Sequence, residues 1–161
     1  MKSLRIYLDT SVLGGCYDPE FERWSAALIQ DFRLGYFRPV LSDVTAAEVL
    51  PAPEPVREVY AELLDLGAEV LPVTLEALGL RATYEARGIL RSRFENDMLH
   101  IALATVADVD VLVSWNFRHI VRLDRIRLFS AVNIELGYKP LTIYSPREVT
   151  IRGRDESDPG S

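Results

Sequence analysis

Four oxygen-bearing side chains lie near predicted strand ends or helix starts, where they could act together. They are Asp9, directly after the apolar run Leu4–Leu8; Glu48, in "SDVTAAEVL"; Asp97, in "RFENDMLHIALA"; and Asn116, in "VLVSWNFRHI". Each also has an ordinary structural explanation. A carboxylate can cap a helix or favour its positive N-terminus, and an asparagine can hold a turn.

The shared chemistry of these side chains favours a cation site. Gathered carboxylates repel one another, and one of them would have to take up a proton unless a cation lay between them. Mg²⁺ binds oxygen ligands and keeps several of its waters. A cation of this kind activates water and stabilises the charge that develops on a phosphoryl group. The pattern therefore suits metal-dependent phosphoryl chemistry.

The elements that would bring these residues together are strands alternating with helices. Strands are expected at Leu4–Leu8, Pro39–Ser42, Glu69–Val73, Val109–Ser114 and Leu141–Tyr144, and helices at Phe21–Leu34, Ala46–Leu50, Val56–Leu66, Leu75–Ala86, Asn96–Val106 and Asp124–Leu136. This alternation requires crossover connections and predicts a mainly parallel sheet. The first and fourth runs are apolar enough to be central strands. In such a sheet, residues after the strand ends gather at one edge, where ligands bind.

Composition places the chain among globular proteins. Its 161 residues are 48% hydrophobic and 26% charged, which suits one domain with a substantial core. No run approaches the ~18 apolar residues of a membrane span, and we expect neither a signal peptide nor a membrane partner. The single cysteine, Cys16, predicts a reducing, cytoplasmic location and a buried structural thiol. Residues 1–150 form the predicted domain, and residues 151–161 a disordered tail.

Charge is distributed unevenly along the chain. The formal net charge of −6 argues against a broad nonspecific nucleic-acid coat. Residues 1–80 carry 13 acidic and 6 basic side chains, whereas residues 81–128 carry 8 arginines against 6 acids. Arginine suits bidentate phosphate contacts and is equally common on solvated helices.

The ordered motifs resemble the PIN domain family, and most closely its VapC-like ribonuclease toxins. "YLDTSVLGG" resembles the opening strand with the first acid, and "SDVTAAEVL" the segment that carries the second. "ENDMLHIALATVADVDVLVSWNFRHIV" resembles the third-acid helix, the following strand and the fourth polar position. "LTIYSPREV" resembles the closing strand and its S/T-P-x-E segment, so the likeness extends from residue 4 to about residue 149.

This resemblance implies a fold, a metal and a set of ligands. The fold is a three-layer α/β/α sandwich with a mainly parallel central sheet of about five strands. Asp9, Glu48 and Asp97 match the catalytic, metal-binding acids, with Mg²⁺ as the cofactor and Mn²⁺ as an alternative. Asn116 stands where many members have aspartate. Its carbonyl oxygen can bind a metal, but it carries no charge and cannot act as a base.

The resemblance also implies a function and partners. The expected activity is metal-dependent endoribonuclease cleavage by the toxin of a type II toxin–antitoxin pair, with an RNA substrate, a cognate antitoxin and a homodimeric assembly. Arg118 and Arg122 are the candidates for substrate phosphates. Ser11 and Ser114 could hold water or phosphate, although a structural role is favoured for both. His100 and His119 are predicted to be packed residues rather than catalytic ones, and Trp115 and Phe117 to pack rather than stack RNA bases.

Three alternatives compete with this interpretation. A haloacid-dehalogenase-type phosphatase would have an acid two residues after Asp9, where this chain has Ser11. A response-regulator receiver would have its aspartate after a middle strand, and Lys139-Pro140 here precedes the last strand instead of following a late one. A degenerate, non-cleaving PIN domain that binds RNA or protein remains open, and Asn116 is its main support.

Overall fold

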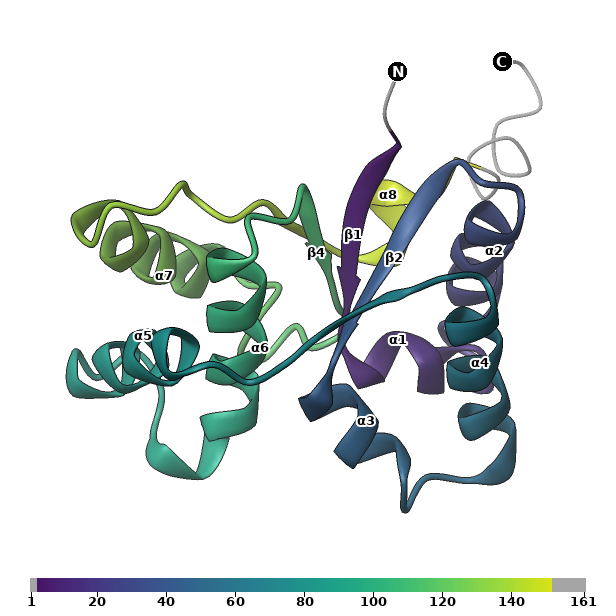
Figure 1. Cartoon of the computed structure of the whole chain (residues 1–161), viewed down its shortest axis with the longest axis horizontal. Coiled ribbons are helices and arrows are strands. Elements are labelled where there is room, and N and C mark those ends of the chain that lie inside the picture. The colour runs from purple at the N-terminus through teal and green to yellow at the C-terminus, as the bar shows by residue number, and fades with distance from the viewer. Residues whose placement is uncertain (1–2, 152–161) are drawn as a thin grey trace.

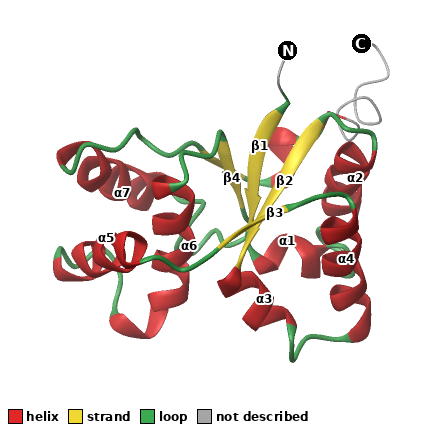
Figure 2. Cartoon of the chain, viewed as in Figure 1, coloured by secondary structure: helices red, strands yellow, loops and turns green. Residues whose placement is uncertain are grey.

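The computed structural model describes residues 3–151, so the tail predicted from residue 151 lies outside the described residues except for Ile151. All five predicted strands are present: β1 (Leu4–Leu8), β2 (Phe37–Ser42), β3 (Glu69–Leu71), β4 (Val111–Val113) and β5 (Ile143–Tyr144). They form one sheet in the order β3-β2-β1-β4-β5, and every neighbouring pair is parallel. Figure 2 shows β1, β2, β3 and β4 of this sheet. The predicted parallel sheet is confirmed, with β1 at its centre and β4 beside it.

The six predicted helices also form, with ends shifted by up to three residues. They are α2 (Glu22–Arg33), α3 (Asp43–Val49), α4 (Glu54–Asp65), α5 (Leu75–Ala86), α6 (Glu95–Val106) and α7 (Leu123–Glu135). Three short elements were not predicted: α1 (Thr10–Gly15), the 3₁₀ turn η1 (Ser92–Phe94) and α8 (Pro146–Val149). Each spans two turns or fewer, which is too short for a 3.6-residue hydrophobic period to be recognised.

Helices cover both faces of the sheet. Helices α5, α6 and α7 lie on one side of the strands, and α2 and α4 lie on the other (Figure 1). The alternation of β1 side chains assigns Tyr7 to the core on the α6 side, and Ile6 and Leu8 to the core on the α2 side. This is the three-layer α/β/α arrangement.

Helix α6 is the most deeply buried helix of the α5–α7 layer. Residues Met98–Thr105 are all buried, as expected for a helix that is apolar on every side. Asp97 lies just before this run, in the first turn, so burial of the helix fixes its position at the carboxyl edge of the sheet. Within residues 3–151, no helix has the length and apolar character needed to cross a bilayer.

Candidate active site

Asp9 lies at the carboxyl end of the central strand, locked in place by two serines. Leu8 pairs with Val113, so Asp9 and Ser114 leave two neighbouring strands side by side. Ser11 Oγ donates to Asp9 Oδ1 at 2.5 Å, and Ser114 Oγ donates to Oδ2 at 2.6 Å. These serine oxygens also accept hydrogen bonds from the backbone N–H groups of Trp115 and Asn116. Both hydroxyls therefore tie the end of β1 to the end of β4.

Burial makes the charge of Asp9 costly. The residue is only 5% exposed, and this desolvation raises the pKa of its carboxyl group above the ordinary value. The positive field of His100 and the two serine hydrogen bonds oppose the rise, whereas the Asp97 charge adds to it. Asp9 and Asp97 thus belong to one electrostatic site that a cation would stabilise.

Glu48 is held by Thr10 and by a histidine. Thr10 Oγ1 donates to Glu48 Oε1 at 3.0 Å, and His100 Nε2 lies 2.7 Å from the same oxygen. The other ring nitrogen of His100, Nδ1, lies 2.6 Å from the hydroxyl of Tyr7, which in turn lies 2.7 Å from Ser42 Oγ. A buried polar chain therefore runs from the end of β2 through β1 and α6 to Glu48.

The direction of the hydrogen bonds in this chain follows from the carboxylate. Burial would raise the pKa of Glu48, but the hydrogen bond and charge of His100 and the hydrogen bond from Thr10 outweigh it, so the pKa is lowered. The ionised Glu48 can only accept, and His100 Nε2 must therefore donate. The Tyr7 hydroxyl links the other ring nitrogen, Nδ1, to Ser42 Oγ, so every polar atom of the chain has a partner.

Asp97 and Asn116 meet through a second histidine. His119 Nδ1 lies 2.9 Å from Asp97 Oδ2, and the His119 backbone N–H donates to Asn116 Oδ1 at 2.9 Å. Asn116 Oδ1 also accepts from the backbone N–H of Arg118 at 3.2 Å. The carbonyl oxygen of Asn116 is thus engaged in its own turn, which fits the turn-holding role. Its assignment as a fourth metal ligand stays a prediction.

The donor set fits a hard cation in its chemistry. Among the described residues 3–151, Oε2 of Glu48 and Oδ1 of Asp97 accept no hydrogen bond, which leaves an open carboxylate oxygen on each acid. In the same part of the chain, no three histidine, cysteine, aspartate or glutamate side chains are grouped closely enough to enclose one metal ion. An ion shared by the three acids would therefore be held partly through water, as Mg²⁺ commonly is, or after side-chain rotation.

The predicted site residues are connected by the fold to different degrees. One hydrogen-bonded network joins Asp9, Ser11, Ser114, Asn116 and Asp97. Glu48 lies in a second network, with Thr10 and His100. Arg118 is exposed, and Arg122 is half-exposed and forms an ion pair with Asp124 at 2.8 Å. Sequence reasoning missed the two histidines as partners of the acids. The three-residue spacing from Asp97 to His100 was a usable signal that His100 faces the acidic site, since it places both residues on one helix face. No comparable spacing in the sequence pointed to His119.

The predicted packing role of Trp115 and Phe117 has a specific form. The ring of Trp115 stacks on Phe21 with centroids 4.2 Å apart, and Phe117 lies 6.0 Å from Trp115 in an edge-on arrangement. Trp115 Nε1 also donates to Ser25 Oγ at 2.8 Å. Trp115 is buried and Phe117 half-exposed, so packing of α2 against the end of β4 stabilises the segment that carries Ser114 and Asn116.

Comparison with known proteins places this geometry in a family. The sequence model of the PIN domain matches residues 6–126. The chain also resembles three solved structures in fold: VapBC2 from Rickettsia felis bound to a promoter DNA fragment, FitAcB from Neisseria gonorrhoeae, and a toxin–antitoxin complex from Klebsiella pneumoniae.

The fold likeness covers most of the chain at low sequence identity. The Rickettsia structure is 14% identical with a TM-score of 0.55, and the match covers 88% of this chain and 98% of that one. The Neisseria structure is 17% identical with a TM-score of 0.56, and the match covers 89% of this chain and 99% of that one. The Klebsiella structure is 14% identical with a TM-score of 0.53, and the match covers 71% of this chain and 88% of that one. A sequence comparison with functionally curated proteins found no match.

Proposed function

The chain belongs to the PIN domain family, and on that premise we propose that it is a metal-dependent endoribonuclease, the toxin of a type II toxin–antitoxin pair. The observation that carries the proposal is the hydrogen-bonded edge of the sheet that holds Asp9, Glu48 and Asp97, with an open oxygen on Glu48 and Asp97. The three carboxylates share this edge, His100 contacts Glu48 and His119 contacts Asp97, and a cation would offset the repulsion between the acids.

The metal in this proposal is Mg²⁺, with Mn²⁺ as a substitute. Asp9, Glu48 and Asp97 would hold it, with Asn116 as the fourth ligand. When bound, the cation would lower the pKa of a water molecule and neutralise charge on the phosphoryl group under attack. Because Asn116 adds no charge, a second ion would bind weakly.

The protein residues in the proposed reaction have distinct roles. Ser11 and Ser114 hold both oxygens of Asp9, and His100 and Thr10 hold Glu48. Arg118 and Arg122 follow the turn of Asn116 and would bind phosphates of the RNA strand. Ser11 and Ser114 bind substrate only if they release Asp9, so their support of that carboxylate is the favoured role.

Partners and location follow from the family and from the fold. The three similar structures are described as VapBC2, FitAcB and a toxin–antitoxin complex, which supports a cognate antitoxin as a partner for this chain. A homodimer and a cytoplasmic location complete the proposal. The single cysteine supports the cytoplasmic location because it permits no internal disulfide.

A non-cleaving PIN domain that binds RNA or protein is the second candidate. Two observations favour it: Asn116 replaces a charged ligand, and its carbonyl oxygen is engaged by two backbone N–H groups. The three intact acids favour the nuclease instead.

Cleavage of a labelled RNA panel separates the two candidates. The purified protein is incubated with each RNA in Mg²⁺, Mn²⁺ or EDTA, and Asp97→Asn serves as the matched inactive variant. The nuclease should produce discrete fragments with either metal and none in EDTA or with the variant. Binding of RNA without fragments in either metal would assign the chain to the non-cleaving class.

A further inference from the structure

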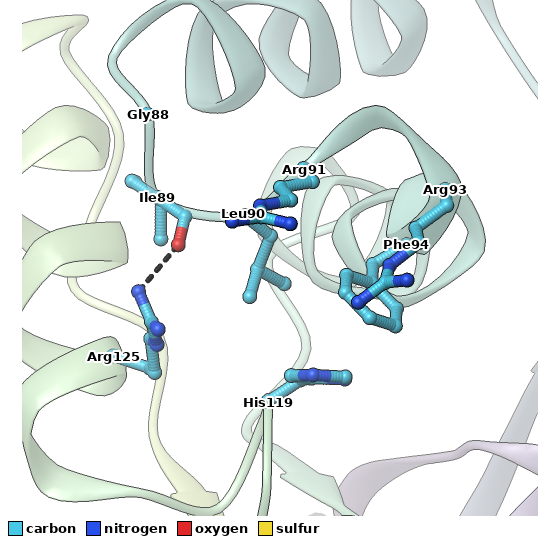
Figure 3. Close-up of a pocket in the computed structure, with 8 residues that line it drawn as sticks. All are labelled: Gly88, Ile89, Leu90, Arg91, Arg93, Phe94, His119 and Arg125. Carbon is cyan, nitrogen blue, oxygen red and sulfur yellow. Dashed lines mark hydrogen bonds between the residues drawn. The ribbon is translucent and has the colours of Figure 1, made fainter.

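A basic cavity of about 200 Å³ lies beside the acidic site. Its wall comes from the connection between α5 and α6, from η1, from the turn after β4 and from the start of α7. Figure 3 shows Arg125 on one side of this cavity and Arg93 and Phe94 on the other, with His119 between them. Gly88 has a φ of 73°, a left-handed conformation that ends α5 and turns the chain along the cavity wall.

The cavity wall carries positive charge that has no acidic partner. None of its eight lining residues is acidic. Arg91, Arg93 and Arg125 form no ion pair with any residue between 3 and 151. Three guanidinium groups that line one cavity without a carboxylate make it electropositive, and an anion bound there would be stabilised.

Two of these arginines are held in place by their neighbours. The guanidinium carbon of Arg93 lies 4.7 Å from the centre of the Phe94 ring, in a cation–π contact. Arg125 Nη1 donates to the backbone carbonyl of Ile89, whereas Arg125 Nε is buried and has no hydrogen-bond acceptor among the described residues. Both arginines are therefore fixed on the cavity wall, and the guanidinium of Arg125 is partly desolvated.

The cavity is physically joined to the acidic site by His119. The ring of His119 lines the cavity and lies 4.0 Å from the ring of Phe94, and its Nδ1 contacts Asp97 Oδ2 at 2.9 Å. A group bound in the cavity would therefore lie one side chain away from Asp97.

We propose that this cavity is a phosphate subsite. It binds one backbone phosphate of single-stranded RNA, next to the phosphodiester bond that is cleaved at the site of Asp97. Arg91, Arg93 and Arg125 supply the donors, with planar guanidinium groups that match phosphate oxygens two at a time. The volume equals about seven waters at roughly 30 Å³ each, which accommodates a phosphate group with its hydration but no stack of bases.

The subsite rests on the proposed ribonuclease function and adds the residues that position its substrate. Arg118 and Arg122 lie outside the lining of the cavity, so two separate sets of arginines would contact the strand. A strand held by both sets would be oriented toward the acids, because correct positioning of the reacting groups supplies much of a rate enhancement.

The test measures RNA binding without cleavage. Fluorescein-labelled single-stranded RNA is titrated in EDTA against the wild type, Arg91→Ala, Arg93→Ala and Arg93→Lys, at several salt concentrations. Loss of either arginine should weaken binding about tenfold. It should also reduce the slope of log affinity against log salt by about 0.7 for one lost phosphate contact. Arg93→Lys should recover the slope more fully than the affinity, since lysine keeps the charge without the planar donor pair.

Arg57→Ala is the matched control, because Arg57 is an exposed arginine on α4, on the opposite side of the sheet (Figure 1). It removes the same charge and should leave affinity and slope unchanged. Equal behaviour of Arg57→Ala and both cavity variants would overturn the subsite.

Inorganic phosphate separates this inference from the proposed function. Phosphate should shift the NMR resonances of His119 in the wild type and have a smaller effect in Arg93→Ala. If the wild type cleaves RNA and the arginine variants bind RNA like the wild type, the phosphate subsite is overturned and the proposed nuclease function is retained. Absence of cleavage with arginine-dependent RNA binding and phosphate shifts would remove the nuclease and support the subsite. Phosphate shifts without arginine-dependent RNA binding would assign the cavity to free phosphate and overturn the RNA assignment.

Discussion

His100 Nε2 lies 2.7 Å from Glu48 Oε1, and this contact joins a buried position in the middle of α6 to an acid of α3. The opposite ring nitrogen contacts Tyr7, so one imidazole connects the core to the candidate metal site. Removal of this ring takes one hydrogen bond from the buried Tyr7 hydroxyl, which keeps Ser42, and one from the partly exposed Glu48, which keeps Thr10.

We therefore expect His100→Ala to lower the free energy of unfolding by about 2–4 kcal/mol, from the two lost hydrogen bonds and the space left behind. A double-mutant cycle with Glu48→Ala should give a coupling of about 0.5–3 kcal/mol, measured by urea unfolding in EDTA. His119→Ala combined with Glu48→Ala is the control and should be additive, because these side chains share no contact. Additivity of the His100 and Glu48 variants would show that their contact does not stabilise the fold.

Metal affinity should depend on Asp97 and not on its neighbour in the same helix turn. Asp97→Asn should lower Mn²⁺ affinity severalfold or more, because hard cations respond to ligand charge. Glu95→Gln removes the same charge from an exposed position in the first turn of α6 and should bind Mn²⁺ like the wild type. Calorimetric titration of the three proteins provides the comparison, and identical isotherms would remove Asp97 from the ligand set.

Asn116→Asp adds a fourth negative charge beside the three acids. If the side chain binds metal, this variant should be less stable than the wild type in EDTA, because carboxylate repulsion increases. It should regain that stability in Mg²⁺ and cleave RNA faster at subsaturating Mg²⁺. Melting temperatures and cleavage rates across a Mg²⁺ series measure both effects. Superimposable curves would leave Asn116 with only the turn-holding role of its carbonyl oxygen.

Gly15 and Gly14 form a matched pair for a test of packing. A Cβ on Gly15 would lie 2.5 Å from Ser25 Oγ and 2.7 Å from Trp115 Nε1, whereas a Cβ on Gly14 would meet nothing within 4 Å. Gly15→Ala should lower the free energy of unfolding by about 1–3 kcal/mol through overpacking. Gly14→Ala should raise it by up to about 1 kcal/mol through helix propensity. Urea unfolding of both variants measures the two free energies. Equal changes in the free energy of unfolding would mean that the segment of Trp115 moves away from the added methyl group at no energetic cost.

The thiol of Cys16 should be unreactive at neutral pH. Burial raises its pKa to about 11; the charge of Arg33 lowers the pKa by a smaller amount, and the charge of Glu62 adds to the rise. Because the thiolate is the reactive form, about one thiol in a thousand is reactive at pH 8, and alkylation should accelerate with pH until about pH 11. The same protein in denaturant is the control and should reach its plateau near pH 9, as an ordinary cysteine does. A plateau near pH 9 in the folded protein would contradict the shift.

The sequence by itself determined the helices and strands and the parallel direction of the strands in the sheet. Each strand and each long helix has a local signal, a short apolar run or a 3.6-residue period, and the alternation of the two types requires crossovers. The positions of Asp9, Glu48 and Asp97 near the ends of such elements follow from the same signals, since parallel strands end at one edge. The short elements α1, η1 and α8 lacked a period long enough to be recognised.

Only the tertiary structure decided what surrounds each acid. His100 is separated from Glu48 by 52 residues and from Tyr7 by 93, so no local pattern could pair them. The sequence predicts His100 as an ordinary core residue because its neighbours in α6 are apolar. Burial alone does not tell which polar partner the imidazole will contact. The cavity lined by Arg91, Arg93 and Arg125 joins two segments that the sequence holds apart by a helix and a strand. Packing of α6 and α7 against one face of the sheet brings them together, and it is this long-range packing, driven by apolar burial rather than by the polar groups themselves, that sets the chemistry of the site.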